Sequence, residues 1–171
     1  MPKPHPLLWI NLPGPLPFRG LNISTTTDVP FGTGDASFQA AGGESGLARL
    51  VEDFYLIMDE LEDARCVRHL YPCDLAESRK RLAAFLCGWL GGPRRYAEHY
   101  GSISIPQFHT RWTVGEAERD AWLKCMELAI ARQGYTDAFA DYLLIQLRVP
   151  AERILQAGRR ACPGQLTTTV I

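Results

Sequence analysis

The segment GGESGLARLVEDFYLIMDE, residues 42–60, decides the fold of this chain. Its apolar residues, continued by Leu61, recur at steps of three and four and share one face of an α-helix. They are Leu47, Leu50, Val51, Phe54, Met58 and Leu61. Glu44 suits the positive N-terminal end of a helix. The segment therefore predicts a long amphipathic helix whose apolar face packs against other helices.

A second helix is predicted after a short segment at residues 64–70. Asp74 is a good N-cap, and Glu77 three residues later would complete a capping box. This helix ends at the glycine pair 91–92, and a brief helix follows over residues 95–100. Both elements favour an all-helical chain.

The second half of the chain continues this pattern. Residues 116–133 predict a strong helix closed by Gly134, and another helix begins near Asp137. Pro150 need not end that helix, since a proline can kink a helix or be followed by a restarted final turn, here through Leu155. Residues 102–114 are expected to form a loop, because Pro106 bars a long helix. No strand alternation is convincing, so the fold class is all-α.

The two ends of the chain differ from its centre. Residues 1–36 hold seven of the twelve prolines and are expected to form an extended arm or a disordered tail, since proline disrupts helices. Residues 37–160 are expected to form one domain, and residues 161–171 a frayed tail.

Composition excludes several classes of protein. The net charge is −1, so no basic footprint for nucleic acid exists. No apolar run approaches the roughly 20 residues of a membrane span, and no signal-peptide layout is present, so we expect a cytoplasmic protein. The five cysteines form no CxxC pair, which argues against zinc and for reduced thiols.

His109 is the strongest candidate for a metal ligand among the four histidines. It lies in a short constrained segment between two helices, in the run ISIPQFHTRWTVGEAERDAWLKCM of residues 103–126. Haem iron takes a neutral imidazole held in place by a hydrogen bond on its other nitrogen. Spacing alone leaves His69 and His99 open as alternatives, or no ligand at all.

Three aromatic residues with polar tips occur in apolar settings. Tyr55, Tyr71 and Trp122 could donate hydrogen bonds to a bound ligand that carries partial negative charge. The alternative is that each is a core aromatic whose polar tip is satisfied elsewhere.

Three motifs, GGESGLARLVEDFYLIMDE (residues 42–60), YPCDLAESRKRLAAFLCGWLGGPRRY (71–96) and GEAERDAWLKCM (115–126), closely resemble the group II truncated haemoglobins in order and spacing. The resemblance covers about residues 38–160. It implies a two-over-two helical sandwich around haem b (iron protoporphyrin IX), with reversible O2 binding. It also implies reactions with nitric oxide and peroxides.

The resemblance also assigns roles by position. His109 matches the proximal iron ligand, and Tyr55, Tyr71 and Trp122 match residues of the distal site. Ser78 falls where other globins place a distal histidine. We expect its small side chain either to admit water or to bond to its own helix backbone.

Further residues are expected around the macrocycle. Arg81, helped by Tyr96, is the expected partner of a propionate, although a solvated arginine is the alternative. The expected walls are Phe54, Leu82, Phe85, Leu86 and Met126. Around the proximal ligand this chain departs from the family: Phe108 replaces a basic residue and Trp112 the usual phenylalanine, which puts the loop shape in doubt.

Four functions remain open at this level. The first is a globin that binds O2 and other diatomic ligands and converts nitric oxide to nitrate with an unidentified reductase. The others are a peroxidase-like enzyme, a sensor or storage protein that uses the proline-rich arm, and a helical domain without a cofactor. A homodimer is one assembly that the sequence allows.

Overall fold

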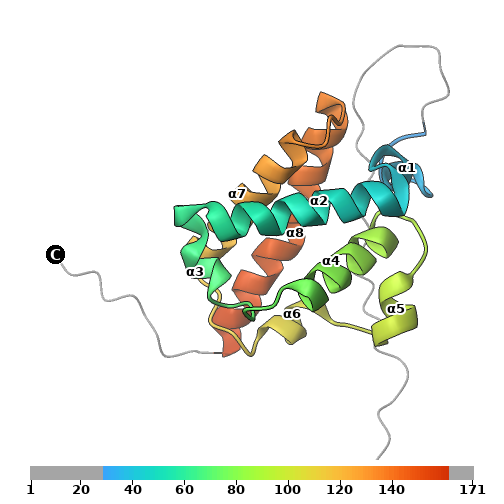
Figure 1. The fold of residues 1–171 in the computed structure, drawn as a ribbon. Coiled ribbons are helices and arrows are strands. Elements are labelled where there is room, and N and C mark those ends of the chain that lie inside the picture. Colours follow the sequence, from blue (N-terminus) through green and yellow to red (C-terminus); the bar gives the residue numbers. More distant parts are fainter. Residues whose placement is uncertain (1–28, 162–171) are drawn as a thin grey trace, which may run out of the picture.

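The computed structural model describes residues 29–161, which contain helices and no strand (Figure 1). Most of the expected proline-rich arm, residues 1–28, and the expected tail, residues 162–171, lie outside the described residues. The helices are α1 (Ala36–Ala40), α2 (Gly43–Glu60), α3 (Arg65–Arg68), α4 (Ala76–Trp89), α5 (Arg95–Tyr100), α6 (Ile105–His109), α7 (Glu116–Ala131) and α8 (Asp137–Ala161), with a 3-10 turn at Glu62–Ala64. Within this range, none of the helices is both long and apolar enough to cross a membrane.

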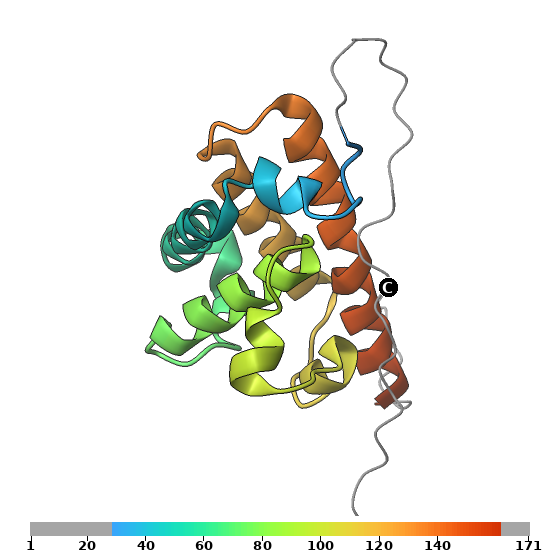
Figure 2. The same ribbon diagram turned by 90° about the vertical axis from the view of Figure 1, so that its right-hand side faces the viewer.

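Two antiparallel helix pairs form the body of the molecule. Helix α2 pairs with α4 and α7 pairs with α8, and α2 crosses α7 where the two pairs meet (Figure 1). The apolar face of α2 is fully buried there, with Leu50 and Phe54 both 0 % exposed. Helix α6 lies against the C-terminal half of α8 (Figure 2). The expected all-α fold is confirmed.

Two local expectations were wrong. Residues 105–109 form helix α6 rather than loop, because proline is tolerated in the first turn, where its missing N–H has no partner in any case. As the sequence allowed, Pro150 does not end α8, which continues to Ala161. The capping box of α4 does not form. Asp74 Oδ1 accepts a hydrogen bond from Ala76 N at 2.9 Å, whereas the carboxylate of Glu77 accepts one from Arg81.

Two glycines permit close approaches that set the helix positions. A Cβ atom on Gly46 would lie 1.9 Å from the carbonyl oxygen of Ala41, so α2 could not follow α1 so tightly. A Cβ on Gly91, whose φ is +95°, would lie 1.9 Å from the carbonyl oxygen of Gly34. Any larger residue at either position would push the N-terminal turn away from the helices.

The residues before α2 are fastened to α8. Ser37 is buried, accepts a hydrogen bond from Gly32 N at 2.8 Å and donates one to Tyr142 Oη at 3.3 Å. The ring of Phe31 packs against those of Phe139 and Tyr142, with centroids 5.1 and 5.2 Å away. Residues 29–36, which the sequence assigned to the arm, therefore contact the helical body.

Candidate functional site

A cavity of about 410 Å³ opens between the two helix pairs, with walls from every helix from α2 to α8. Twelve of the fourteen residues expected at the site line it. They are Tyr55, Tyr71, Ser78, Arg81, Leu82, Phe85, Leu86, Tyr96, Phe108, His109, Trp112 and Trp122. Residues that are up to 67 positions apart in the chain therefore meet at one place.

The remaining two expected residues do not line the cavity. Phe54 and Met126 are both fully buried in the core between α2 and α7. The ring of Phe54 packs against those of Tyr55 and Trp122, with centroids 4.9 and 5.1 Å away. The expectation that Phe54 and Met126 form walls of the cavity was wrong, because their helical positions point between the helices; Phe54 instead supports two residues that do line it.

His109 is the last residue of α6, and its side chain is half-buried at the cavity wall. Its Nδ1 atom lies 2.7 Å from the carbonyl oxygen of Ile105, one helical turn earlier. Burial lowers the pKa of His109, the hydrogen bond to Ile105 opposes this, and Arg111 lowers the pKa further. The ring is therefore neutral, and because a carbonyl only accepts, Nδ1 carries the proton. The lone pair on Nε2 remains available to a metal ion.

Two aromatic rings pack against the imidazole of His109. Its centroid lies 5.4 Å from that of Phe108 and 5.9 Å from that of Trp112. Arg111 lies over both neighbouring rings, 4.7 Å from the Phe108 centroid and 5.3 Å from the Trp112 centroid. The two aromatic residues that distinguish this segment thus restrict how the imidazole can turn.

Tyr55, Tyr71 and Trp122 form one hydrogen-bonded group on the cavity wall. The rings of Tyr55 and Tyr71 meet edge to face with centroids 5.6 Å apart. Burial raises the pKa of Tyr55 most strongly, and its hydrogen bond with Tyr71 raises it further, while the same bond lowers the pKa of Tyr71. The two hydroxyl groups are therefore coupled at the cavity wall.

Tyr71 is also hydrogen-bonded to Trp122. Its pKa is raised by burial and lowered by the bond with Trp122, whose indole can only donate. Tyr71 is therefore the member of the group that is bonded to both of the others.

Ser78 lines the cavity on α4 and is hydrogen-bonded to Tyr55 on α2, which lowers the pKa of the tyrosine. The serine is therefore linked to the group formed by Tyr55, Tyr71 and Trp122.

Arg81 lies at the polar edge of the cavity with a partner of its own. Its Nε donates to Glu77 Oε1 at 2.9 Å, and its guanidinium carbon lies 4.4 Å from the centroid of the Tyr100 ring. Although its small burial lowers the pKa of Arg81, the hydrogen bonds with Glu77 and Tyr96 raise it overall. The predicted pair of Arg81 and Tyr96 is thus present, together with a carboxylate that sequence reasoning did not assign to the site.

The sequence analysis missed one wall of the cavity, which comes from α8. Leu147, Ala151 and Ile154 follow one another at helical steps of four and three, so their periodicity was a usable signal. Ile105 also lines the cavity while its carbonyl binds His109.

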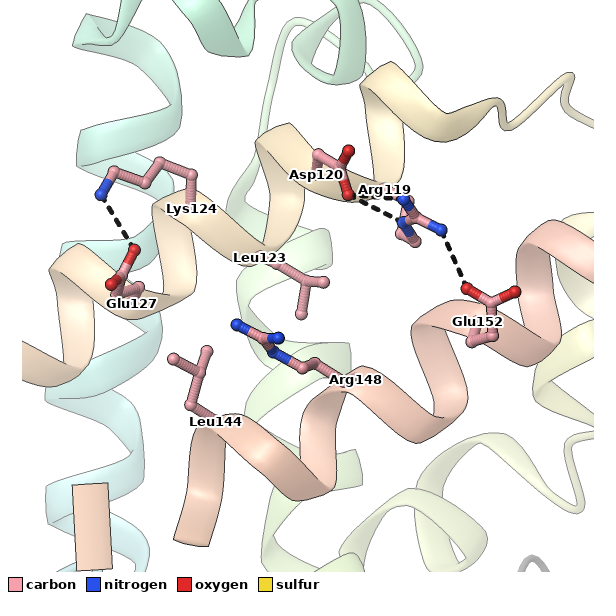
Figure 3. Close-up of a pocket in the computed structure, with 8 residues that line it drawn as sticks. All are labelled: Arg119, Asp120, Leu123, Lys124, Glu127, Leu144, Arg148 and Glu152. Atoms are coloured by element: carbon pink, nitrogen blue, oxygen red, sulfur yellow. Dashed lines mark hydrogen bonds and ion pairs between the residues drawn. The ribbon is translucent and has the colours of Figure 1, made fainter. Parts of the chain in front are cut away.

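A second hollow, of about 460 Å³, lies on the surface between α7 and α8 (Figure 3). Ion pairs occupy much of its wall: Arg119 reaches Asp120 at 2.8 Å and Glu152 at 2.9 Å, and Lys124 reaches Glu127 at 2.9 Å. Three basic and three acidic side chains line this hollow, so its charges are balanced. None of its lining residues was predicted as a site residue from the sequence.

Comparison with known proteins identifies relatives of the helical body. Residues 36–152 match the sequence profile of the family described as bacterial-like globin. A curated relative, Group 2 truncated hemoglobin YjbI of Bacillus subtilis (strain 168), is 28 % identical over 121 residues, 71 % of this chain and 89 % of that protein.

Solved structures agree in fold as well as in sequence. The group II 2-on-2 hemoglobin of the plant pathogen Agrobacterium tumefaciens has a TM-score of 0.66 and 30 % identity, covering 69 % of this chain and 92 % of its own. The truncated oxygen-avid haemoglobin of Bacillus subtilis has a TM-score of 0.63 and 28 % identity, covering 70 % and 98 %. The cold-adapted truncated hemoglobin of Pseudoalteromonas haloplanktis TAC125 has a TM-score of 0.67 and 26 % identity, covering 70 % and 96 %. Together with the two stacked helix pairs and the aromatic cavity between them, these matches show that the chain belongs to the bacterial-like globins, as a group II truncated haemoglobin.

Proposed function

We propose that this globin holds haem b in the cavity between the helix pairs, with His109 as the iron ligand, and binds O2 reversibly. The observation that carries the proposal is the neutral His109 imidazole, whose Nδ1 is bonded to Ile105 and whose Nε2 lone pair is uncommitted. The walls suit a flat apolar group, since leucine, isoleucine, valine and aromatic side chains make up most of them. The residues present therefore fit the cofactor.

The bound haem would supply a ferrous iron that takes a diatomic ligand and exchanges an electron. The task of His109 is to present Nε2 at one orientation. The 2.7 Å hydrogen bond to Ile105 fixes the tautomer, and the rings of Phe108 and Trp112 limit rotation of the imidazole.

Tyr71 is the proposed donor to the outer atom of a bound ligand. Trp122 donates to its oxygen, and Tyr55 is hydrogen-bonded to it as well. We take Tyr55 to be the donor of that second bond, which leaves the Tyr71 proton for the ligand. Hydrogen bonds in series polarise one another, so Tyr71 donates more strongly than an isolated phenol. One buried bond of this kind is worth about 1–3 kcal/mol.

Arg81 and Tyr96 are the proposed contacts for a haem propionate at the polar edge of the cavity. Glu77 already holds Arg81 at 2.9 Å, so a propionate would have to share the guanidinium or displace this carboxylate. Arg81 can serve two carboxylates because its guanidinium carries five N–H donors.

For the reaction, we propose conversion of nitric oxide to nitrate at the expense of the bound O2, with a reductase returning the protein to its ferrous form. The donor group around Tyr71 favours a long-lived, polarised ligand, which this reaction needs. A peroxidase-like role receives less support. It would need a base near the ligand, and the Ser78 hydroxyl that occupies the corresponding position is engaged with Tyr55.

The test is rapid mixing of the haem-loaded, reduced protein in air-saturated buffer with nitric oxide, followed by nitrate analysis. We expect one nitrate for each nitric oxide consumed. The variant Tyr71→Phe should lose O2 faster and yield less nitrate, while Tyr135→Phe, remote from the cavity, should behave as the unaltered protein. Loss of nitric oxide without nitrate would reject the reaction while leaving O2 binding in place.

A further inference from the structure

A ridge of four side chains on the outer surface of α8 has no function in the haem site. Asp141, Ile145, Val149 and Arg153 follow one another at steps of four residues, so they form one continuous row. The two apolar members in the middle are unusually open, with Ile145 50 % and Val149 42 % exposed. We call this row the α8 ridge.

The charged ends of the α8 ridge have no partner within the part of the chain that the structure describes. No ion pair or hydrogen bond there involves Asp141 or Arg153. A neighbouring charged residue of α8 is paired: Glu152 binds Arg119 at 2.9 Å on the side of α8 that faces α7 (Figure 3). The ridge thus presents an acidic end, an apolar centre and a basic end, and no side chain of residues 29–161 pairs with either charged end.

This pattern is complementary to itself. When the ridge is laid antiparallel to an identical ridge, the acidic end of each meets the basic end of the other. With Ile145 opposite Val149 of the partner subunit, the same register places Asp141 opposite Arg153 of the partner subunit, four positions further out on each side. Rows of residues four apart interdigitate in the commonest class of helix packing. A two-fold interface uses one surface patch twice, so every such contact occurs twice.

We propose that the α8 ridge is the interface through which two copies of this chain form a two-fold dimer. Ile145 and Val149 exclude water at its centre, and the two pairs of Asp141 with Arg153 fix the antiparallel register. A single helix ridge is a small interface, so the dissociation constant is on the order of micromolar. The proposed interface does not cover the cavity. The α8 residues that line the cavity, among them Leu147, Ala151 and Ile154, lie on other faces of the helix than the α8 ridge.

The test is sedimentation of the full chain with haem bound, over a range of concentrations, in four forms. The unaltered protein should pass from 19.1 kDa to twice that mass as concentration rises. Asp141→Arg and Arg153→Asp, each alone, place like charges opposite one another and should raise the dissociation constant at least tenfold. The double variant D141R/R153D restores opposite charges in both pairs and should dimerise as the unaltered protein does.

Glu60→Arg is the matched control, an equal charge change at an exposed position on α2. It should leave the dimer unchanged. Circular dichroism of each variant checks that the helices are intact. A protein that stays monomeric at all concentrations overturns the proposal, including the case in which residues 1–28 cover the ridge. A dimer that neither single reversal weakens also overturns it, because the copies would then meet through another face.

Discussion

The Nδ1 atom of His109 lies 2.7 Å from the carbonyl oxygen of Ile105, four residues earlier in the same short helix. The partner of the imidazole is therefore supplied by α6 itself, and no side chain from another helix is needed. Ile105 is buried and α6 packs on α8, so the carbonyl is held in place. The five residues of α6 bring the proposed iron ligand His109, the carbonyl group bonded to its Nδ1 and the ring of Phe108 to the cavity together.

Replacing His109 by alanine should abolish haem uptake by the purified protein. The reason is that the variant loses the sole proposed iron ligand and leaves a gap beside Phe108. Titration with haemin, followed by absorption near the Soret maximum, measures this. Free imidazole should restore binding by filling the gap. His69→Ala, at an exposed position, is the control, and equal haem affinity of the two variants would contradict the assignment of His109.

Replacing Tyr71 by phenylalanine should raise the rate of O2 dissociation roughly 5- to 150-fold, the equivalent of a lost buried hydrogen bond of about 1–3 kcal/mol. Tyr55→Phe should have a smaller effect, since we propose that Tyr55 donates to Tyr71 rather than into the cavity. Stopped-flow displacement of O2 by carbon monoxide gives the rates. A larger effect at Tyr55 than at Tyr71 would reverse the proposed direction of the hydrogen bonds.

Gly46→Ala should lower the free energy of unfolding by about 1–3 kcal/mol or more, as expected for overpacking against backbone. The added Cβ would lie 1.9 Å from the Ala41 carbonyl oxygen. Gly158→Ala is the matched control, since its Cβ would have only Val114 O at 3.7 Å and α8 should gain up to about 1 kcal/mol from the better helix former. Urea unfolding of the haem-free proteins compares them, and equal stabilities would show that α1 can move aside.

Stability should fall as the pH rises from about 10, partly through Tyr135. Burial raises the pKa of Tyr135 to about 12, opposed by Arg49, and its hydroxyl donates to the Ala41 carbonyl oxygen at 3.3 Å. Because the unfolded chain loses this proton near pH 10 and the folded chain only near 12, the stabilisation is complete below pH 10 and is lost between these values.

Tyr135→Phe should flatten this dependence. One proton corresponds to a slope of about 1.4 kcal/mol per pH unit, so the free energy of unfolding of the variant should fall less steeply above pH 10 by up to that amount. Unfolding curves in urea at several pH values provide the measurement. Parallel pH profiles for the two proteins would show that Tyr135 ionises equally in both states.

The periodic segments were predictable, and the exceptions have local causes. The apolar face of α2 and the length of α7 follow from residue spacing alone. The sequence did not reveal α6, because proline both disfavours a helix interior and suits a helix start. It also suggested a capping box at Asp74, since spacing cannot tell that Glu77 would pair with Arg81 instead.

The site was predictable mainly as a set of residues. Spacing along the chain together with the family resemblance indicated twelve residues that line the cavity. The directions of their hydrogen bonds were not predictable. Tyr55, Tyr71 and Ser78 come from different parts of the chain, and which hydroxyl donates depends on the positions of α2 and α4.

By itself, the sequence determined the long helices and which of their faces are apolar, because these depend on residue types at short, regular spacing. His109 could be singled out only with the family resemblance, since spacing alone left other histidines open. Only the tertiary structure decided that Phe54 and Met126 stay in the core, that residues of α8 on both sides of Pro150 line the cavity, and that Tyr55, Tyr71 and Trp122 meet at its wall. Those outcomes depend on how separate helices are placed against one another, and that placement results from packing across the whole molecule.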